Sequence, residues 1–314
     1  VVRELFPQDY AGLGAMVGFV PNLRRAVFQN EKVREALNYA YDFEELNRTL
    51  FYGQYERIDS YFFGLDGLRW KGLPEGEELA ILESVRDKIP ASVFTTEYVN
   101  PVSGDSQKLR ANLRTALGLL QEAGYTLQGN KLVDANGQQL TFEILLNGPT
   151  QEPNALAFQK NLRTIGIEAT IRTVDSPQYT ARTQTFDYDM IYSAWGQSLS
   201  PGNEQRYFFG SSSAKDEGSQ NYMGVADPGI DALIDKVIFA DDRETLEAAT
   251  RALDRVLMAH HYLVPTYSLR NSRVARWDRF SHPETLPAYS SAFPTIWWWD
   301  ADKAKKTGGA NTGN

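Results

Sequence analysis

Three segments with strand character alternate with two helical segments between residues 140 and 195, and this order constrains the fold more than any other feature. Strand-forming residues fill 140–146, 167–174 and 188–195. Pro153 begins the first helical segment and Gly166 ends it, whereas Ser176 and Pro177 begin a shorter one. This alternation predicts parallel strands with helices on the faces of the sheet. The predicted fold class is therefore α/β, with a mostly parallel sheet flanked by helices.

Further helices and a hairpin are predicted on both sides of this segment. Apolar residues at helical spacing predict helices at 31–40, 43–51 and 75–87, from Ser106 to just before Gly124, and after Asp227 and Asp241. Asn136 and Gly137, between β-forming residues, predict a hairpin turn. The segment LVPTYSLRNSRVARW is predicted to be extended and to re-enter the sheet, and its Pro265 favours an edge position.

The composition excludes several classes of protein. Of the 314 residues, 42% are hydrophobic and 23% are charged, which is typical of a globular chain. The formal net charge of -8 argues against nucleic-acid binding, which needs clustered Lys and Arg. The absence of Cys excludes disulfides and fits the cytosol or a bacterial periplasm. No apolar run predicts a membrane span, VVRELFPQDY lacks the features of a signal peptide, and the polar residues 303–314 predict a disordered tail.

The histidines and serines do not form a convincing catalytic or metal site. His260 and His261 are adjacent, so on a helix they would point about 100° apart. The only other histidine, His282, lies in a Pro-containing loop past a strand. The serine run 211–213 lacks the G-x-S-x-G pattern of a nucleophile elbow. We therefore predict no metal and no nucleophilic triad.

The acidic pairs and the glycine-rich segment also favour structural roles. Asp187 and Asp189, like Asp300 and Asp302, could be glycosidase carboxylates, but at this spacing they more often lie at solvated ends of elements. GLGAMVG at 12–18 resembles a dinucleotide fingerprint only loosely, because no strand precedes it and no helix pattern follows directly. The sequence thus predicts a protein that is not an enzyme and has no cofactor.

Trp195 lies where the strand 188–195 gives way to a loop. In open α/β sheets, ligands bind beyond the carboxyl ends of the strands. Gly196 leaves space there, and Gln197, Ser198 and Asn203 supply neutral donors and acceptors for an uncharged or peptide-like ligand. Two interpretations of Trp195 stay open, a wall of a ligand site and a plug at the top of the core.

Several segments, in the same order along the chain, resemble the extracellular solute-binding proteins of family 5, the peptide- and nickel-binding components of ABC importers. They are KVREALNYAYDFEELNRTLFYG, LRTALGLLQEAGY with DANGQQLTFEILL, and NYMGVADPGIDALID followed by a long helix and LVPTYSL. Within the family, WGQSLSPGNEQ and NRTLFYGQYERIDSYF are similar to the subgroup that contains the microcin C-type peptide binder.

The resemblance implies a receptor of the periplasmic-binding-protein type, whose two lobes close on a ligand at a hinge. Family members are far longer at their amino end, so this chain resembles their carboxyl-terminal portion. The implied organisation is 1–14 as hinge and partial first lobe, 15–275 as the second ligand-binding lobe, and 276–302 as the return to the hinge and first lobe. The implied location is the periplasm of a Gram-negative bacterium, and the implied partner is an ABC permease, with peripheral docking to the membrane complex only.

The resemblance also implies ligand contacts, with one departure. Dipeptide- and oligopeptide-binding members carry an Asp three residues after the strand-end Trp, where it pairs with the ligand's amino group, but this chain has Ser198 there. Glu204 could substitute, or the ligand could be modified, longer, or bound by its terminus elsewhere. For a peptide or peptide-like solute, Trp195 is expected to stack on or wall the ligand, and Gln197, Ser198 and Asn203 to hydrogen-bond its backbone. Tyr192 and Tyr267 are expected as secondary contacts.

Two alternatives and one structural question remain. A carbohydrate-binding receptor, or a carbohydrate-active enzyme with Asp187 or Asp189 as its acid, could use the Tyr and Trp content to stack sugars. The run Trp297–Trp299 is expected either to expose an apolar patch, if its packing partners lie outside this chain, or to fold back on the lobe.

Overall fold

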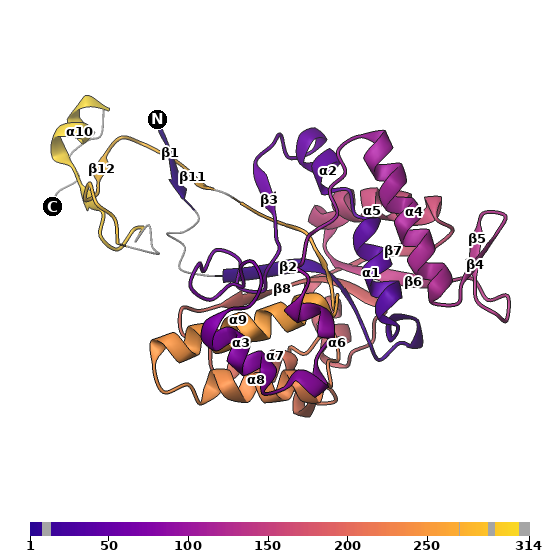
Figure 1. The fold of residues 1–314 in the computed structure, drawn as a ribbon. Coiled ribbons are helices and arrows are strands. Elements are labelled where there is room, and N and C mark those ends of the chain that lie inside the picture. The colour runs from indigo at the N-terminus through magenta and orange to yellow at the C-terminus, as the bar shows by residue number, and fades with distance from the viewer. Residues whose placement is uncertain (8–13, 270, 288–292, 308–314) are drawn as a thin grey trace.

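The computed structural model describes residues 1–7, 14–269, 271–287 and 293–307, and a five-stranded sheet lies at its centre (Figure 1). In spatial order the strands are β7 (Glu168–Val174), β6 (Thr141–Asn147), β8 (Met190–Gln197), β2 (Gly14–Pro21) and β9 (Val264–Pro265). β6 is parallel to β7 and β8, whereas β2 is antiparallel to both of its neighbours. The predicted α/β class and the parallel strands are confirmed, and Pro265 lies on an edge strand.

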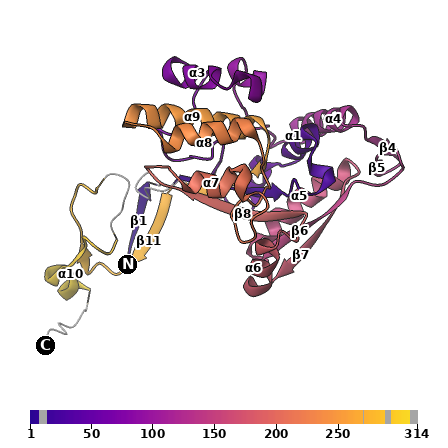
Figure 2. The ribbon, with the colours of Figure 1, turned by 90° about the horizontal axis from the view of Figure 1, so that it is seen from below.

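Helices cover the sheet on two sides, each with its own apolar core. One core includes Met16, Ile191 and Trp195 of the strands and the helices α3 (Gly76–Glu83), α7 (Glu204–Phe209), α8 (Pro228–Ile238) and α9 (Arg243–Ala259). The other includes Phe19 and Ile144 and the helices α1 (Glu31–Tyr39), α2 (Phe43–Thr49), α4 (Ser106–Glu122) and α5 (Glu152–Thr164). Helix α6 (Ser176–Gln184) connects β7 to β8. Figure 2 shows α3 as the outermost helix, over α9.

Side-chain caps fix where most of the predicted helices begin. The N-caps that accept a backbone N–H in the first turn are Asn30, Asp42, Asp105, Asp175, Asp227 and Asp242. Each such cap satisfies a donor that the helix itself leaves free. The start predicted at Asp241 is therefore one residue early, because Asp242 accepts from Thr245 N at 2.8 Å. Short 3-10 helices occur at Ala26–Phe28, Arg86–Lys88, Ala91–Phe94, Pro149–Gln151 and Ser211–Ser213.

Two local features differ from the sequence prediction. A hairpin forms earlier than expected, between β4 (Thr126–Gln128) and β5 (Lys131–Val133), and the predicted turn at Asn136 and Gly137 follows it and leads to a single bridge from Val133 to Gln139. The segment GLGAMVG, for which no strand was expected, enters β2 at Gly14. Strand β2 pairs with β8 along its whole length.

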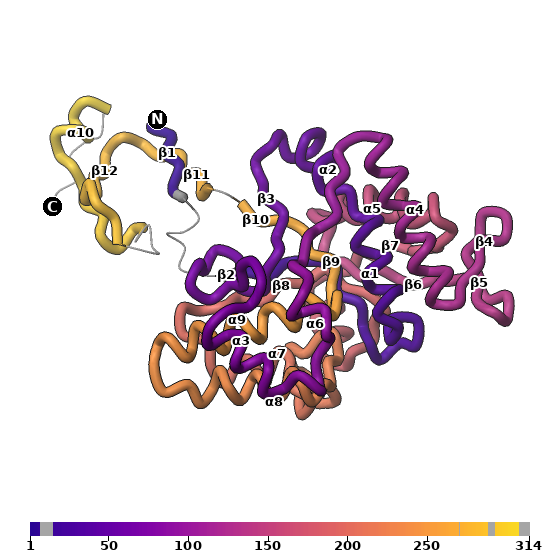
Figure 3. Tube along the Cα trace, viewed as in Figure 1, coloured from indigo at the N-terminus to yellow at the C-terminus, as the bar shows by residue number. Residues whose placement is uncertain are grey.

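A two-stranded ribbon leads from the sheet to the terminal part of the chain (Figures 1 and 3). β1 (Val2–Pro7) pairs antiparallel with β11 (Asn271–Arg276). Nearer the sheet, β10 (Tyr267–Leu269) pairs with β3 (Tyr55–Arg57). Beyond the ribbon, β12 (Phe280–Ser281) pairs with β13 (Trp298–Trp299). The two ends of the chain thus leave the main body side by side.

The terminal part holds the tryptophan run. Trp297 packs against Phe6 and His282, with ring centroids 5.9 and 4.4 Å away, whereas Trp298 and Trp299 are 50% and 44% exposed. The run therefore packs within the terminal part instead of folding back on the main body. Helix α10 (Ala301–Lys306) follows, because Asp300 caps it and Ala304 is buried. The expected disordered tail 303–314 is thus helical up to Lys306, and 308–314 lie outside the described residues.

Candidate functional site

Strand β8 has an edge that no other strand covers near its carboxyl end. Val17 O accepts from Thr266 N at 2.9 Å and Ala15 N donates to Phe63 O at 3.3 Å, so both residues direct their backbone groups away from β8. In an antiparallel pair, two directly opposed residues direct their backbone N–H and C=O groups either toward each other or both outward. Ala194 is opposite Val17 and Gly196 is opposite Ala15, so both direct these groups away from β2.

On that side, β6 pairs with β8 only at Met190 and Ile191. Beyond them, Tyr179 donates its hydroxyl to Tyr192 O at 2.8 Å. Among the described residues, no hydrogen bond reaches Ala194 or Gly196 from this side. Their N–H and C=O groups are therefore free to pair with another extended chain.

The residues of β8 on this side become more exposed toward the end of the strand, where the last two are small. Met190 is buried, Tyr192 is half-buried, and Ala194 and Gly196 are exposed. A Cβ added at Gly196 would meet nothing within 4 Å. The face of the sheet beside the end of β8 is therefore open at Gly196, where a larger side chain would stand next to any backbone that pairs with the edge.

Aromatic residues from three segments form one rim of the free edge. Tyr267 lies 4.5 Å from Phe51 and 4.8 Å from Tyr55 between ring centroids, and its hydroxyl donates to Gln151 Oε1 at 3.3 Å. The Tyr192 hydroxyl lies 3.0 Å from Thr266 Oγ1. Burial raises the pKa of both Tyr192 and Tyr267, so the rim presents neutral hydroxyls and no charge.

Trp195 and Gln197 point to the opposite face of the sheet from Ala194, because side chains alternate along a strand. Trp195 is 1% exposed, and its indole N–H donates to Gln220 O at 2.9 Å. Gln197 is also buried and accepts from Gln205 Nε2 at 2.7 Å. In this structure, neither side chain has a free face for a ligand, and the packing of Trp195 is that of a core residue.

Ser198, Asn203 and Glu204 lie just past the end of β8. Ser198 and Asn203 are exposed, and Ser198 Oγ accepts from Ser200 N at 3.2 Å. The Glu204 carboxylate accepts from Gly202 N at 2.8 Å and from Gln205 Nε2 at 3.2 Å, so it is already engaged in holding its own turn. The predicted contacts are therefore divided between two faces. Tyr192 and Tyr267 lie together, Ser198 and Asn203 are accessible, and the other three are buried or engaged.

Sequence reasoning missed the most accessible part of this region. Ala194 and Tyr55 were not singled out, and Phe51 was expected only as the end of the helix at 43–51. The exposure of Ala194 and Gly196 could have been inferred from their places two and four residues after Tyr192, but only if the pairing of β8 with β6 was known to end at Ile191. That termination depends on pairing between segments distant in sequence.

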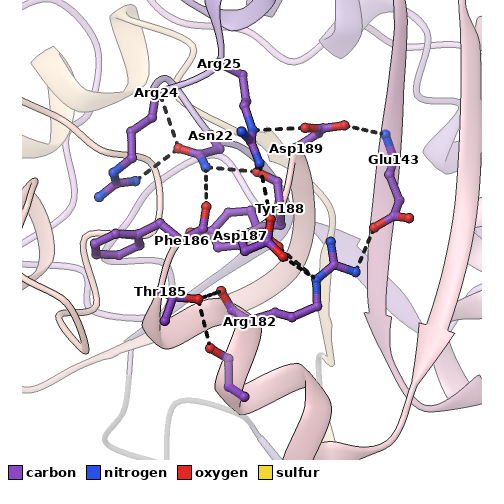
Figure 4. A network of polar contacts seen from close by, with 11 residues as sticks. Asn22, Arg24, Arg25, Glu143, Arg182, Thr185, Phe186, Asp187, Tyr188 and Asp189 are labelled. Carbon is purple, nitrogen blue, oxygen red and sulfur yellow. Dashed lines mark hydrogen bonds and ion pairs between the residues drawn. The ribbon is translucent and has the colours of Figure 1, made fainter.

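The acidic pair Asp187 and Asp189 lies at the opposite end of β8 and is held in ion pairs (Figure 4). Asp189 Oδ1 is 3.0 Å from Arg25 Nε, and its other oxygen accepts from Glu143 N at 3.0 Å. Asp187 Oδ2 is 3.4 Å from Arg182 Nε. These carboxylates thus fix the entry to β8 and lie at the other end of the strand from its free edge.

Two searches of the described residues bear on other functions. Within residues 1–7, 14–269, 271–287 and 293–307, no three His, Asp or Glu side chains gather in a way that could hold a metal ion. No helix in the same ranges combines the length and apolar character that crossing a bilayer requires.

Comparison with known proteins identifies relatives over most of the chain. Residues 6–217 match the bacterial extracellular solute-binding proteins, family 5, middle part. The chain is 51% identical to the "Probable peptide-binding protein YejA" of Agrobacterium fabrum, over 95% of this chain and 48% of the relative. It is 42% identical to the "Peptidoglycan-binding protein YepA" of the same organism, over 96% and 48%.

A solved structure shares the fold. The Bacillus subtilis oligopeptide-binding protein AppA, in complex with a nonapeptide, superposes with a TM-score of 0.65 at 20% identity, over 95% of this chain and 52% of that protein. The chain spans about half the length of the curated relatives that it matches.

Proposed function

Because the chain belongs to the bacterial extracellular solute-binding proteins, family 5, we propose that it forms the carboxyl-terminal part of the substrate-binding component of an ABC importer, with a peptide or peptide-like solute as its ligand. The family named from the sequence is thereby confirmed. It is a family of solute-binding proteins, not of enzymes.

The free edge of β8 is the observation that carries the choice of a peptide. An extended peptide can add to an unpaired strand edge through its own N–H and C=O groups. Ala194 and Gly196 offer such groups beside an open space, and their small side chains allow a second backbone to come close. A compact solute without a repeating amide backbone would use few of these groups.

The neutral surroundings of the edge limit which part of the ligand lies there. Tyr192, Tyr267, Ser198 and Asn203 offer hydroxyl and amide groups, and the Glu204 carboxylate is engaged in its own turn. A free ammonium group buried here would lack a counter-charge, which is costly. The proposed ligand therefore places its uncharged backbone at the edge, and its amino terminus is blocked or bound elsewhere.

The proposed roles follow the two faces of β8. Ser198 and Asn203 contact the ligand beyond the strand end, and Tyr192 and Tyr267 form the rim. Trp195 and Gln197 support the edge from behind, and Glu204 shapes the turn that carries Asn203.

The proposed organisation is one lobe, 15–275, joined by a hinge to a second lobe that lies largely outside this chain. Two arguments support it. The β1–β11 ribbon carries both ends of the chain away from the sheet side by side. The relatives are also about twice as long as the matched part. The segments 1–14 and 276–302 would belong to the hinge and the second lobe, and the receptor would act in the periplasm and deliver its ligand to a permease.

The test joins this chain to the amino-terminal half of the Agrobacterium YejA relative and examines the purified chimera by native mass spectrometry. A retained mass that fragments as a peptide is expected. The substitution Gly196→Val, which fills the open space on the free edge of β8, should reduce retention at least about tenfold. Gly118→Val is the matched control, because a Cβ at Gly118 on α4 also meets nothing within 4 Å.

The outcomes separate the proposals. A retained oligosaccharide would contradict the peptide assignment and favour a carbohydrate receptor. Equal peptide retention by the Gly196 and Gly118 variants would leave the peptide assignment standing and reject the free edge of β8 as its site.

A further inference from the structure

A cavity of about 390 Å³ lies between α1, the segment 92–101 and the end of α9. Its lining includes Glu31, Glu35, Asn38, Glu97, Tyr98 and His261. None of the residues that form the free edge of β8 or its rim lines this cavity, and its size suits a small molecule.

One face of α1 brings a carboxylate without a partner to the cavity. Glu31, Glu35 and Asn38 follow one another at spacings of four and three residues, so their side chains share a face of the helix. The Glu31 carboxylate is engaged by His260, whose Nδ1 lies 3.5 Å away. The Glu35 carboxylate has no hydrogen bond and no ion pair among the described residues, and its oxygens keep accessible surface.

The charge of Glu35 is poorly compensated by the protein itself. Burial raises the pKa of the Glu35 carboxyl, and the like charge of Glu31 raises it further. Lys32 acts in the opposite direction, but its Nζ forms an ion pair with Glu122. Two carboxylates four residues apart on a helix also destabilise each other. A cation in the cavity would relieve this repulsion.

The segment 92–101 adds a second unpartnered carboxylate and an aromatic wall. Glu97 is exposed, and its carboxylate has no partner among the described residues. The Tyr98 hydroxyl accepts from Asn38 Nδ2 at 2.9 Å and donates to Asn100 Oδ1 at 3.0 Å, so the ring is held in place. Burial raises the pKa of Tyr98 to about 12, so the side chain stays neutral. The face of such a ring attracts a cation.

His261, just after α9, contributes an imidazole without a partner. Its ring is largely buried and lies 5.7 Å from the Tyr98 ring between centroids. Neither ring nitrogen has a hydrogen-bond partner among the described residues, and Nδ1 is buried whereas Nε2 keeps accessible surface. Burial lowers the pKa of His261 to about 4, so the imidazole is uncharged near neutral pH. With its proton on Nδ1, Nε2 can accept a hydrogen bond.

The charges of the lining favour a cation as the ligand. Arg255 is the one Lys or Arg among the lining residues, and its Nε donates to the buried Glu78 at 2.7 Å, so its charge already has a counter-charge. The three carboxylates of the lining therefore leave the cavity net negative. An ammonium group has three N–H donors and no acceptor, which suits a site made of acceptors.

We propose that this cavity binds a small alkylammonium ion. The carboxylates of Glu35 and Glu97 are its counter-charges, Nε2 of His261 is a neutral acceptor, and the Tyr98 ring forms a wall for the alkyl part.

The test is an NMR titration of the ¹⁵N-labelled 314-residue chain with n-butylammonium chloride, near neutral pH and at constant ionic strength, with sodium chloride as the balance. The backbone amide signals of Glu35, Glu97 and Tyr98 should shift and saturate, whereas those of Ala194 and Gly196 should stay in place. Magnesium chloride is titrated separately. Saturation of the same signals by magnesium and not by n-butylammonium would overturn the assignment to an organic cation.

Matched variants separate a specific site from the general negative charge of the chain. Glu35→Gln and Glu97→Gln each remove one counter-charge with little change of shape, and each should weaken binding at least about tenfold. Glu217→Gln is the control, because Glu217 is also exposed and without a partner among the described residues, and it does not line the cavity. Its affinity should be unchanged. No saturable shift with n-butylammonium, or an equal loss of affinity in all three variants, would overturn the proposal.

Discussion

Truncating Trp195 tests directly whether this indole stabilises the core or contacts a ligand. Its ring lies among Tyr61, Phe209 and Tyr222, with centroids 6.4, 6.0 and 5.6 Å away, and is 1% exposed. Replacing a buried Trp by Ala costs about 3–5 kcal/mol of stability. The Gln220 carbonyl also loses its indole donor, which adds about 1–3 kcal/mol.

Trp195→Ala should therefore lower the free energy of unfolding by at least about 4 kcal/mol, a large part of the roughly 5–15 kcal/mol of a typical domain. Urea unfolding of the 314-residue chain, followed by far-UV circular dichroism, measures this loss as a lower midpoint. Trp277→Ala is the matched control, because Trp277 is 58% exposed, and its change should stay within about 0.5 kcal/mol.

A milder variant keeps the experiment informative if the alanine variant does not fold. Trp195→Phe retains an aromatic ring and removes mainly the N–H donor, so a loss of about 1–3 kcal/mol is expected. If Trp195→Ala unfolds at the same urea concentration as Trp277→Ala, the indole is not a core residue. Trp195 would then be interpreted as a wall of the ligand site.

Three further predictions concern pH and backbone geometry. Burial raises the pKa of the Asp254 carboxyl to about 7, above its ordinary 3.8, so the folded state holds the extra proton between these values and stability should fall as pH rises through that window. Asp254→Asn should remove this fall in urea titrations, and an unchanged slope would contradict it. Burial lowers the pKa of His261 from 6.5 to about 4, so the unfolded state holds the extra proton there and stability should rise with pH over that interval. His261→Asn, which suits the local φ of 50°, should flatten this rise; a rise as steep as in the unchanged chain would refute the assignment. Gly166→Ala should cost roughly 2 kcal/mol more stability than Gly137→Ala. Both glycines have positive φ, but only at Gly166 would a Cβ lie 2.6 Å from a backbone atom, Leu132 N. Equal thermal midpoints of the two variants would exclude that clash.

Helix starts and the parallel strands were predictable because their causes are local. Asn30, Asp42 and Asp105 each cap a helix within three residues of themselves, and the apolar spacing after them is read directly along the chain. β2 was missed because its glycines resemble a loop. A Cβ at Gly18 would lie 2.4 Å from Val264 O, so this glycine allows β9 to approach, and that requirement comes from a residue far along the chain.

The sequence by itself determined the family, the α/β class and the presence of a strand at Trp195, because these depend on residue order and on periodicities of a few residues. The bounds of that strand are Met190–Gln197, two residues later than the predicted 188–195. Only the tertiary structure decided that Trp195 and Gln197 face the core and that Ala194 and Gly196 face the open side. The physical reason is that a strand presents alternate residues to two faces, and which face is covered depends on helices and strand ends supplied by distant segments.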